Sequence, residues 1–350
     1  MKPTSLLRKE ILSAKNRLPA LLVLLVLVPA VFAGASLAFD DVIPRDAPVA
    51  VVPADEDVTQ EELDAVSATL SVLADPVIYD DASGYERALV REEVYAVVEV
   101  PSNFVDEGGT FVVHAHGAVV PFDEPSKLLV NVLDSGLSAT GADITVERNL
   151  VGDDKNLSEY LLPVLLTVLV FVLGLVYVPH DLRREKQALE RLRLETSLVS
   201  VVLTKVLFYS VLLSVPIAVF QFIAYYLGYG VSFASLPSIV FLVVTFVYMS
   251  FLGTAVALTA RFSAYGRLLN VVILFGTLVL SNIIYPVGFF SSLRREVAVL
   301  TPTHYSALAI RSHATKDLPA TFFAHSLAVL VGFTARTFVA LVVASRRYEA

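Results

Sequence analysis

The side chains best suited to metal chemistry in this sequence are two histidines. His114 and His116 lie two residues apart in a predicted strand, so both side chains point to one face and could together chelate a soft or borderline metal. Two ligands alone rarely close a metal site, and no cysteine or further histidine lies nearby. The sequence therefore predicts two solvent-facing strand histidines and no metal site.

Motifs that position a nucleophile, a catalytic metal or a phosphate are absent from the sequence. It contains no His-Glu-x-x-His, Gly-x-Ser-x-Gly or phosphate-loop pattern. The Gly108-Gly109 pair is followed by neither a helix nor a lysine, so it predicts a turn. The lack of cysteine excludes disulfides and thiolate chemistry. We therefore expect that the chain is not an enzyme and binds no cofactor of its own.

The most informative polar stretch is residues 180–196, which read His-Asp-Leu-Arg-Arg-Glu-Lys-Gln-Ala-Leu-Glu-Arg-Leu-Arg-Leu-Glu-Thr. Strong helix formers fill it, and Asp181 suits the positive end of a helix. Leu182, Leu189 and Leu192 fall near one face. An apolar stripe needs a burial site, which a partner protein or the membrane surface can supply. A solvated linker helix is the remaining interpretation, and we favour docking of a partner protein.

Long apolar runs recur along the chain. Residues 206–260 contain no charged side chain over 55 positions. Because about 20 apolar residues span the hydrocarbon core, this run suits two crossings, separated by the turn signal of Gly228, Gly230 and Pro237. Four further runs cover residues 18–39, 160–179, 268–293 and 318–345. The sequence therefore predicts a polytopic α-helical membrane protein with six transmembrane helices.

The first apolar run has a second interpretation. Its basic start, apolar centre and small residues at 35–38 resemble a cleavable signal peptide. At 22 residues the run is longer than a usual signal core, so a membrane anchor is favoured. Cleavage would remove one helix and leave the following segment on the same side of the membrane.

Charge divides the chain into two unlike parts. The net charge is −8, but residues 40–159 alone hold 26 Asp and Glu against 6 Lys and Arg, and the remainder is basic. Such acidity keeps a segment soluble and argues against nucleic acid as a partner. We therefore expect one acidic, water-exposed segment inserted into a basic membrane body.

The basic residues predict the orientation in the membrane, because Lys and Arg favour the cytoplasmic side of short loops. With six crossings, fifteen of them share one side: Lys2, Arg8, Lys9, Lys15, Arg17, Arg183, Arg184, Lys186, Arg191, Arg193, Lys205, Arg261, Arg267, Arg346 and Arg347. Arg294, Arg295, Arg311 and Lys316 would lie on the other side, against the rule. We expect a multi-pass cell-membrane protein with both termini cytoplasmic and the acidic segment extracytoplasmic.

The acidic segment alternates strand and helix patterns. Strands are predicted at residues 49–52, 77–79, 95–100 and 110–115. A helix begins at Thr59, where Thr-Gln-Glu-Glu supplies a cap, a short helix covers residues 84–93, and a longer one covers residues 125–146 with Gly136 and Gly141 as possible interruptions. This pattern predicts an extracytoplasmic α/β domain between helices 1 and 2.

A few polar side chains fall inside the apolar runs. Gln221, Asn270 and Asn282 are candidates for hydrogen bonds between helices or for a substrate pathway. Arg336 lies within the last run, ten residues before Arg346. A charge inside the bilayer usually faces the bundle or a cavity. Alternatively, a long arginine side chain can reach the lipid headgroups from inside the helix, and Arg336 lies only two to three turns from the helix end.

Three local patterns, in this order along the chain, resemble one family. The first is Tyr95-Ala-Val-Val-Glu-Val-Pro101-Ser-Asn-Phe104. The second is Glu185-Lys186 followed by Leu189-Glu190-Arg-Leu192, Ser197 to Ser200 and Lys205. The third is Tyr285-Pro286-Val-Gly-Phe-Phe290 followed by Leu300-Thr-Pro302-Thr-His-Tyr305 and Arg311. They resemble the permease subunits of type-2 ABC transporters, in particular the sodium- or drug-exporter-like branch with a large external domain after the first helix. The chain departs from the family at Ala188, Thr196 and Thr204, where Thr, Pro and Gly are frequent.

The resemblance implies a division of labour along the chain. Residues 1–39 would form an interfacial helix and transmembrane helix 1, residues 40–157 the external domain, and residues 158–350 helices 2–6 with a coupling helix at 181–196. The residues implied in coupling to an ATPase are Arg184, Glu185, Lys186, Leu189, Glu190, Leu192 and Lys205. The implied partners are a cytoplasmic ABC ATPase, which would hold ATP and magnesium, and a second permease copy in a homodimer or heterodimer within the lipid bilayer.

An ATP-driven exporter permease is therefore the expected function. The alternative is a membrane-anchored binding or scaffold protein whose acidic domain recognises a ligand. A single anchor would suffice for that role, and the polar groups inside the helices weigh against it. A membrane enzyme is disfavoured because no catalytic constellation is found.

Overall fold

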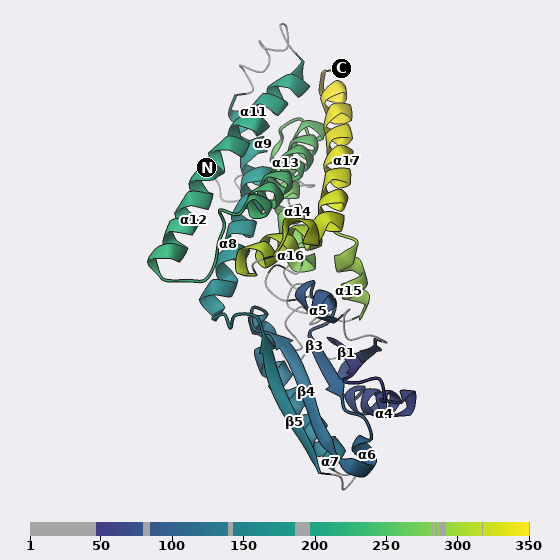
Figure 1. Ribbon diagram of the computed structural model, residues 1–350. Helices are drawn as coiled ribbons and strands as arrows, with labels where there is room; N and C mark the ends of the chain where they lie inside the picture. The colour runs from purple at the N-terminus through teal and green to yellow at the C-terminus, as the bar shows by residue number, and fades with distance from the viewer. Residues whose placement is uncertain are drawn as a thin grey trace, which may run out of the picture.

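The computed structural model describes residues 47–79, 85–138, 143–185, 197–281, 283, 286, 292–316 and 318–349. They form an elongated molecule with a long helical body and a sheet domain at one end (Figure 1). The predicted interfacial helix and transmembrane helix 1, residues 1–39, lie outside the described residues.

The sheet domain contains five strands in the order β2-β1-β3-β4-β5. They are β1 (Ala47–Pro53), β2 (Ala74–Ile78), β3 (Ala96–Val100), β4 (Gly109–His116) and β5 (Ile144–Val151). The pairs β1–β2, β1–β3 and β4–β5 are parallel, and β3–β4 is antiparallel. Within the described residues, the connections between the strands contain the α-helices α4 (Gln60–Leu70), α5 (Tyr85–Val90), α6 (Phe104–Glu107) and α7 (Asp123–Ser138).

Helices α4 and α7 cover one face of the sheet and form the main core of the domain. Val51 and Val98 of the strands belong to one buried cluster with Val66 of α4 and Leu133 of α7. Helix α4 begins as predicted: the backbone N–H of Thr59 donates to the carboxylate of Glu62, and the Thr59 hydroxyl accepts from the Glu62 N–H. This reciprocal cap satisfies two of the free donors at the helix start.

The predicted helix at residues 125–146 is wrong in its second half. Helix α7 ends at Ser138, and residues 144–151 form the strand β5, which the sequence interpretation missed. Ile144 and Val146 are β-branched and alternate with more exposed residues, the period of a strand with one covered face. Gly136 does not interrupt α7; it allows close approach to α4, since a Cβ there would lie 2.9 Å from Thr69.

The helical body follows directly from the last strand. Only residues 152–156 separate β5 from α8 (Leu157–Val172), which continues through a π-helical turn, η4 (Leu173–Tyr177), into α9 (Val178–Arg184). Asn156 caps α8, accepting from the N–H of Glu159 while the Glu159 carboxylate accepts from the Asn156 N–H. A second Glu159 oxygen accepts from the N–H of Gly230 at 2.6 Å. The sheet is thus joined to the body by a short, hydrogen-bonded connection.

The remaining helices complete the body. They are α11 (Leu198–Leu212), α12 (Ser214–Tyr226), α13 (Leu236–Thr259), α14 (Ala264–Leu280), α15 (Ser292–Val299), α16 (Pro302–Thr315) and α17 (Ala324–Glu349). Within the described residues, four stretches are long and apolar enough to cross a membrane: Leu157–Arg184, Leu198–Tyr226, Leu236–Thr259 and Thr321–Glu349. A shorter apolar helix covers Ala264–Leu280. The uncharged run therefore divides into two long helical stretches as predicted, with the turn between Tyr226 and Leu236.

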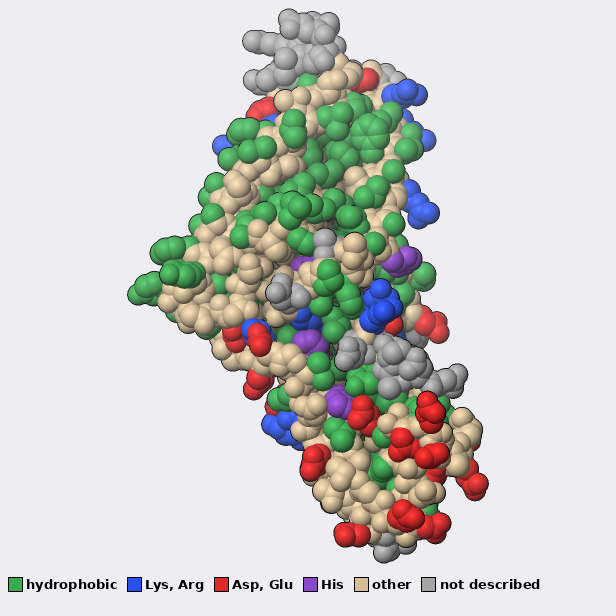
Figure 2. All heavy atoms as spheres, in the orientation of Figure 1, with side chains coloured by type: hydrophobic (Ala, Val, Ile, Leu, Met, Phe, Trp, Pro, Cys, Tyr) green, Lys and Arg blue, Asp and Glu red, His purple; other side chains and the backbone are tan. Residues whose placement is uncertain are grey.

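Helix α13 lies at the centre of the body. Tyr248 and Met249 are fully buried, and glycines allow close approach between α13 and the π-helical turn. A Cβ at Gly253 would lie 2.4 Å from the carbonyl oxygen of Leu175, and one at Gly174 would lie 2.8 Å from Met249 Cβ. On the face shown in Figure 2, the body is largely apolar, whereas acidic side chains gather on the sheet domain. This division matches a body surrounded by lipid and a domain surrounded by water.

Candidate functional site

The first candidate site is a polar cluster where α9 ends and α11 begins, at the end of the body opposite the sheet domain (Figure 1). We call it the loop-end cluster: Asp181, Glu185, Lys205 and Tyr209. The Lys205 ammonium contacts Asp181 Oδ2 and lies 2.7 Å from Glu185 Oε1. The Tyr209 hydroxyl donates to Asp181 Oδ2 at 2.8 Å. A hollow of about 520 Å³ borders the cluster.

The loop-end cluster brings together two of the predicted coupling residues, Glu185 and Lys205. Arg184 is exposed and has no carboxylate within 4.0 Å among the described residues. Residues 181–184 belong to the end of the long helix through α9 rather than to the start of a separate helix. Asp181 therefore forms an ion pair with Lys205 near the end of a helix and does not cap the start of one. The other predicted coupling residues lie outside the described residues: Lys186, Leu189, Glu190 and Leu192.

The second candidate site joins the sheet domain to the body. We call it the junction cluster: Glu92, Arg311 and Lys316. Arg311 donates to Glu92 Oε2, while the Lys316 ammonium lies 3.6 Å from Glu92 Oε1 and donates to the carbonyl of Val90 at 2.8 Å. The three side chains are only 3%, 3% and 4% exposed. An acid that follows α5 is thus held between two cations, one in α16 and one directly after it.

The backbone of Glu92 is held in an unusual conformation. Its φ of 58° lies in the left-handed region, which is costly for a residue other than glycine. Such strain persists only where the surroundings fix it. Here the buried ion pair with Arg311 supplies that restraint, so the turn after α5 and helix α16 depend on each other.

Electrostatics in the junction cluster follow from burial and mutual proximity. Burial alone would raise the pKa of Glu92, but the charges of Arg311 and Lys316 outweigh it and lower that pKa. Burial lowers the pKa of Lys316 to about 8, although Glu92 opposes the shift. Glu92 is therefore ionised at neutral pH. Its negative charge partly offsets the free-energy cost of burying Arg311 and Lys316.

Two aromatic side chains contact arginines in or beside the junction cluster. The guanidinium of Arg311 lies 5.2 Å from the ring centre of Tyr160 in α8. Arg91, beside Glu92, lies 5.1 Å from the ring centre of Phe322 and donates to its carbonyl at 3.4 Å. These cation–π contacts extend the joint to α8 and to the 3-10 turn η6 (Ala320–Phe323) that precedes α17.

The prediction that His114 and His116 are solvent-facing is wrong, because both are buried, at 8% and 9% exposure. His114 Nε2 lies 3.2 Å from Glu99 Oε2, and its ring stacks on Tyr85. His116 Nδ1 accepts from the N–H of Ala118 at 3.1 Å. Burial, followed by the charge of Lys316, lowers the pKa of His116 to about 4. The described residues contain no group of three His, Cys, Asp or Glu that could hold a metal.

The predicted polar residues of the body are placed apart from one another. Gln221 Oε1 accepts from the N–H groups of Phe233 and Ala234 at 2.7 and 3.2 Å. Asn270 Nδ2 donates to the carbonyl of Gly253 at 3.0 Å and so links α14 to α13. Arg336 is exposed on α17, and Asn282 lies outside the described residues.

Sequence reasoning missed a buried hydroxyl network between α13 and α16. Thr245 donates to the Ser306 hydroxyl at 3.0 Å, and the Tyr248 hydroxyl lies 3.1 Å from the same oxygen. It also missed the partners of Glu92. Single hydroxyls in apolar runs carry no signal of their own, and Glu92 is one of many acids in its segment.

Long apolar helices around a few buried polar groups define the class of multi-pass α-helical membrane proteins. A family model described as ABC-2 family transporter protein matches residues 19–343. The chain belongs to this family and is a membrane component of an ABC transporter. Neither a curated protein nor a solved structure matches it.

Proposed function

We propose that this chain is the permease subunit of an ATP-driven exporter, in which separate cytoplasmic ATPase subunits hold ATP and magnesium. Two permease copies, identical or related, would form the pathway across the cell membrane, each contributing six transmembrane helices. The observation that carries the proposal is the loop-end cluster. It holds Asp181 and Glu185 of the helix end at α9 to Lys205 of α11, at the end of the body farthest from the sheet domain.

The position of the loop-end cluster suits contact with a soluble partner. In the proposed orientation it faces the cytoplasm, and the acidic sheet domain faces the outside. Arg184, Glu185, Lys186, Leu189, Glu190 and Leu192 would then offer charged and apolar contacts to the ATPase. Lys205 would pass a displacement of this segment to α11 through its ion pairs with Asp181 and Glu185.

The π-helical turn η4 supports a coupling role for the helix that ends at Arg184. π-Helical turns inside α-helices are frequent at functional sites. This one lies directly before α9, and its Gly174 packs closely against α13. A displacement of α9 at the loop end would therefore be transmitted to α13 through η4, where the helix departs from regular α-helical geometry.

The junction cluster supports the proposed orientation. Arg311 and Lys316 are two of the four basic residues that oppose the charge rule if their segment lies outside. Both are buried against Glu92, so they present little positive charge to the membrane surface. Two exceptions to the rule thus have a structural reason, because their charges are matched within the fold.

The test is a triple variant, Glu185→Ala, Leu189→Ala and Glu190→Ala, produced in the native host and purified from its membranes. We expect co-purification of a cytoplasmic ATPase with the unaltered chain and loss of that ATPase, with its ATP hydrolysis, from the variant. A matched control removes two acids and one apolar residue from the sheet domain: Glu61, Val72 and Glu107, all exposed. The proposal fails if the triple variant retains the same ATPase and the same hydrolysis rate as this control.

A further inference from the structure

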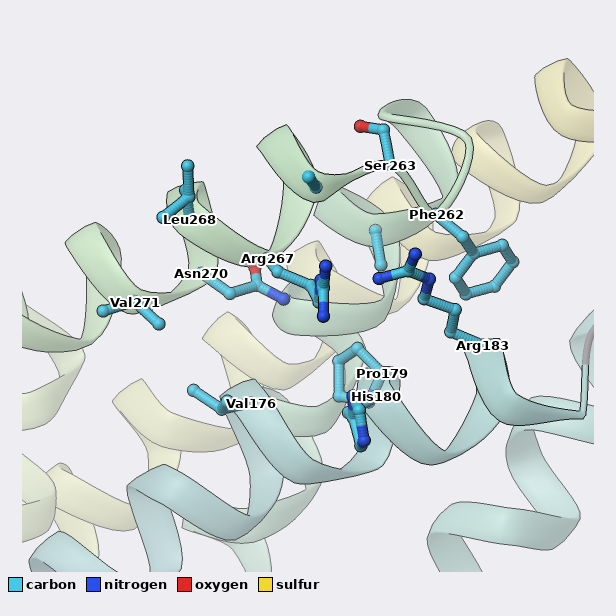
Figure 3. A pocket seen from close by; sticks show the side chains of 12 residues that line it. Val176, Pro179, His180, Arg183, Phe262, Ser263, Arg267, Leu268, Asn270 and Val271 are labelled. Atoms are coloured by element: carbon cyan, nitrogen blue, oxygen red, sulfur yellow. The ribbon is translucent and has the colours of Figure 1, made fainter. Parts of the chain in front are cut away.

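A pocket of about 410 Å³ lies between α9 and α14 (Figure 3). Because α9 also carries Asp181 of the loop-end cluster, the pocket lies at the same end of the body. We call it the arginine pocket. Its polar lining comes from His180 and Arg183 of α9, Ser263 before α14, and Arg267 and Asn270 of α14. None of these residues belongs to the loop-end cluster or the junction cluster.

Two positive charges meet in this pocket. The guanidinium groups of Arg183 and Arg267 point toward each other across it (Figure 3). In the part of the chain that the structure describes, neither has a carboxylate within 4.0 Å. Like charges repel, and an anion between them would be attracted by both. Paired guanidinium groups suit the oxygens of a phosphate.

The start of α14 adds to the attraction for an anion. Ser263 caps this 17-residue helix, and Ala264 of its first turn also lines the pocket. The first N–H groups of a helix have no partner within the helix and carry a partial positive charge. A phosphate held by Arg267 would therefore lie beside the positive end of α14.

Asn270 provides an independent sign of a missing ligand. Its side chain is 2% exposed and lines the pocket. The amide nitrogen donates to the carbonyl of Gly253, but Oδ1 has no hydrogen-bond partner among the described residues. A buried acceptor without a donor is costly. A ligand with a donor, such as a hydroxyl, near its phosphate would satisfy this acceptor.

The rest of the pocket wall is apolar, with Val176, Leu268 and Val271 lining it. It lies where the membrane-crossing stretch Leu157–Arg184 ends, beside the apolar helix α14. Cations and apolar side chains together match an amphiphile at the edge of a bilayer, since basic pockets between membrane helices bind anionic headgroups. We propose that the arginine pocket binds the phosphate of an anionic phospholipid whose headgroup also carries a hydroxyl, as in phosphatidylglycerol.

The test uses the purified full chain in neutral detergent and three probes: dioctanoyl-phosphatidylglycerol, dioctanoyl-phosphatidylcholine and inorganic phosphate. Binding is measured by native mass spectrometry and by the shift of the thermal unfolding midpoint. The test variant is Arg183→Gln with Arg267→Gln. The control is Arg346→Gln with Arg347→Gln, which removes two arginines from the end of α17, outside the pocket.

We expect phosphatidylglycerol to bind the unaltered chain in preference to phosphatidylcholine. Its dissociation constant should rise about tenfold or more in the test variant, because two charge-assisted contacts are lost, and less than about twofold in the control. Asn270→Ala should weaken phosphatidylglycerol but leave dioctanoyl-phosphatidic acid, which lacks the headgroup hydroxyl, unchanged. This comparison isolates the hydroxyl contact from the phosphate contacts.

The remaining outcomes also decide the question. Displacement of phosphatidylglycerol by equimolar inorganic phosphate would overturn the lipid as the ligand and identify the free anion in its place. Equal binding of phosphatidylcholine and phosphatidylglycerol would overturn the proposal, as would equal losses in the test and control variants.

Discussion

The junction cluster and the loop-end cluster use the same chemistry in opposite surroundings. In the first, Glu92, Arg311 and Lys316 are at most 4% exposed, and the guanidinium of Arg311 lies against the ring of Tyr160. In the second, the side chains of Lys205, Asp181 and Glu185 are 12%, 20% and 49% exposed beside an open hollow. Water reaches one cluster and not the other, so equal ion pairs are expected to differ in strength and in freedom to rearrange.

Under the proposed function, this difference would give each cluster its own mechanical role. Removing one partner from a buried pair leaves a charge that water cannot solvate, which makes the pair a fixed joint. An exposed pair is weakened by water and salt and can exchange partners at little cost. A fixed joint at the sheet domain and an adaptable contact at the loop end suit a molecule that receives movement at one end and carries it as a unit to the other.

Arg311→Met tests the fixed joint and should have the largest effect. The side chain volume is nearly kept, but Glu92 loses its main partner, so we expect a loss of about 3–5 kcal/mol in unfolding free energy. Thermal unfolding in detergent, with limited proteolysis of the sheet domain, measures it. The double variant Glu92→Leu with Arg311→Met should recover much of the loss, since Lys316 can release its proton. If the double variant is as unstable as Arg311→Met alone, the interpretation of the junction cluster as a fixed joint is contradicted.

Acidification tests the same end of the molecule with a smaller effect. The pKa of His116 falls from an ordinary 6.5 to about 4 in the folded protein, so between these values the unfolded chain binds the proton more readily. Stability is therefore lost as pH falls from 6.5 to 4, by about 3 kcal/mol at most.

The control for this pH dependence is His116→Gln, whose unfolding midpoint should change less over that range. Lys205→Met, at the loop end, should keep the slope of the unaltered chain. Unfolding curves recorded from pH 7 to pH 4 compare the three proteins. A slope that survives in His116→Gln would assign the pH dependence to another group.

Lys205→Met tests the partly exposed cluster and should have the smallest effect on stability, about 1 kcal/mol. Its cost should shrink further at about 1 M salt, where the screening length falls to about 3 Å. The cost of Arg311→Met should stay nearly constant, because its partner is buried. Unfolding midpoints of both variants at low and high salt give the comparison. Equal salt sensitivity would remove the distinction between the clusters.

Local patterns in the sequence predicted much of the fold. The length of the uncharged run indicated two helical stretches and the turn between them, and the Thr59 cap located the start of α4. The strand β5 was missed because two glycines and a nearby apolar helix pattern masked a short alternation. Its pairing with β4 depends on residues about 35 positions earlier in the chain, which no local pattern reports.

The candidate sites were only partly predictable for the same reason. Glu185 and Lys205 were implied by the resemblance to the family, but Asp181 became their partner only through the packing of α9 against α11. Glu92 and Arg311 are separated by 219 positions, and nothing near either of them indicates the other. The burial of His114 and His116 likewise depends on the body and α5 covering the second face of the sheet.

The short connection from β5 to α8 has a mechanical consequence. Strand β5 has eight residues and, at about 3.3 Å per residue, reaches about 26 Å from the helix that it feeds. With the Asn156 cap and the Glu159 contact holding the connection, a tilt of about 10° in α8 would swing the far end of this arm by about 5 Å. The helix and strand together act as a lever that enlarges a small tilt within the bilayer into a displacement comparable to a side chain's length.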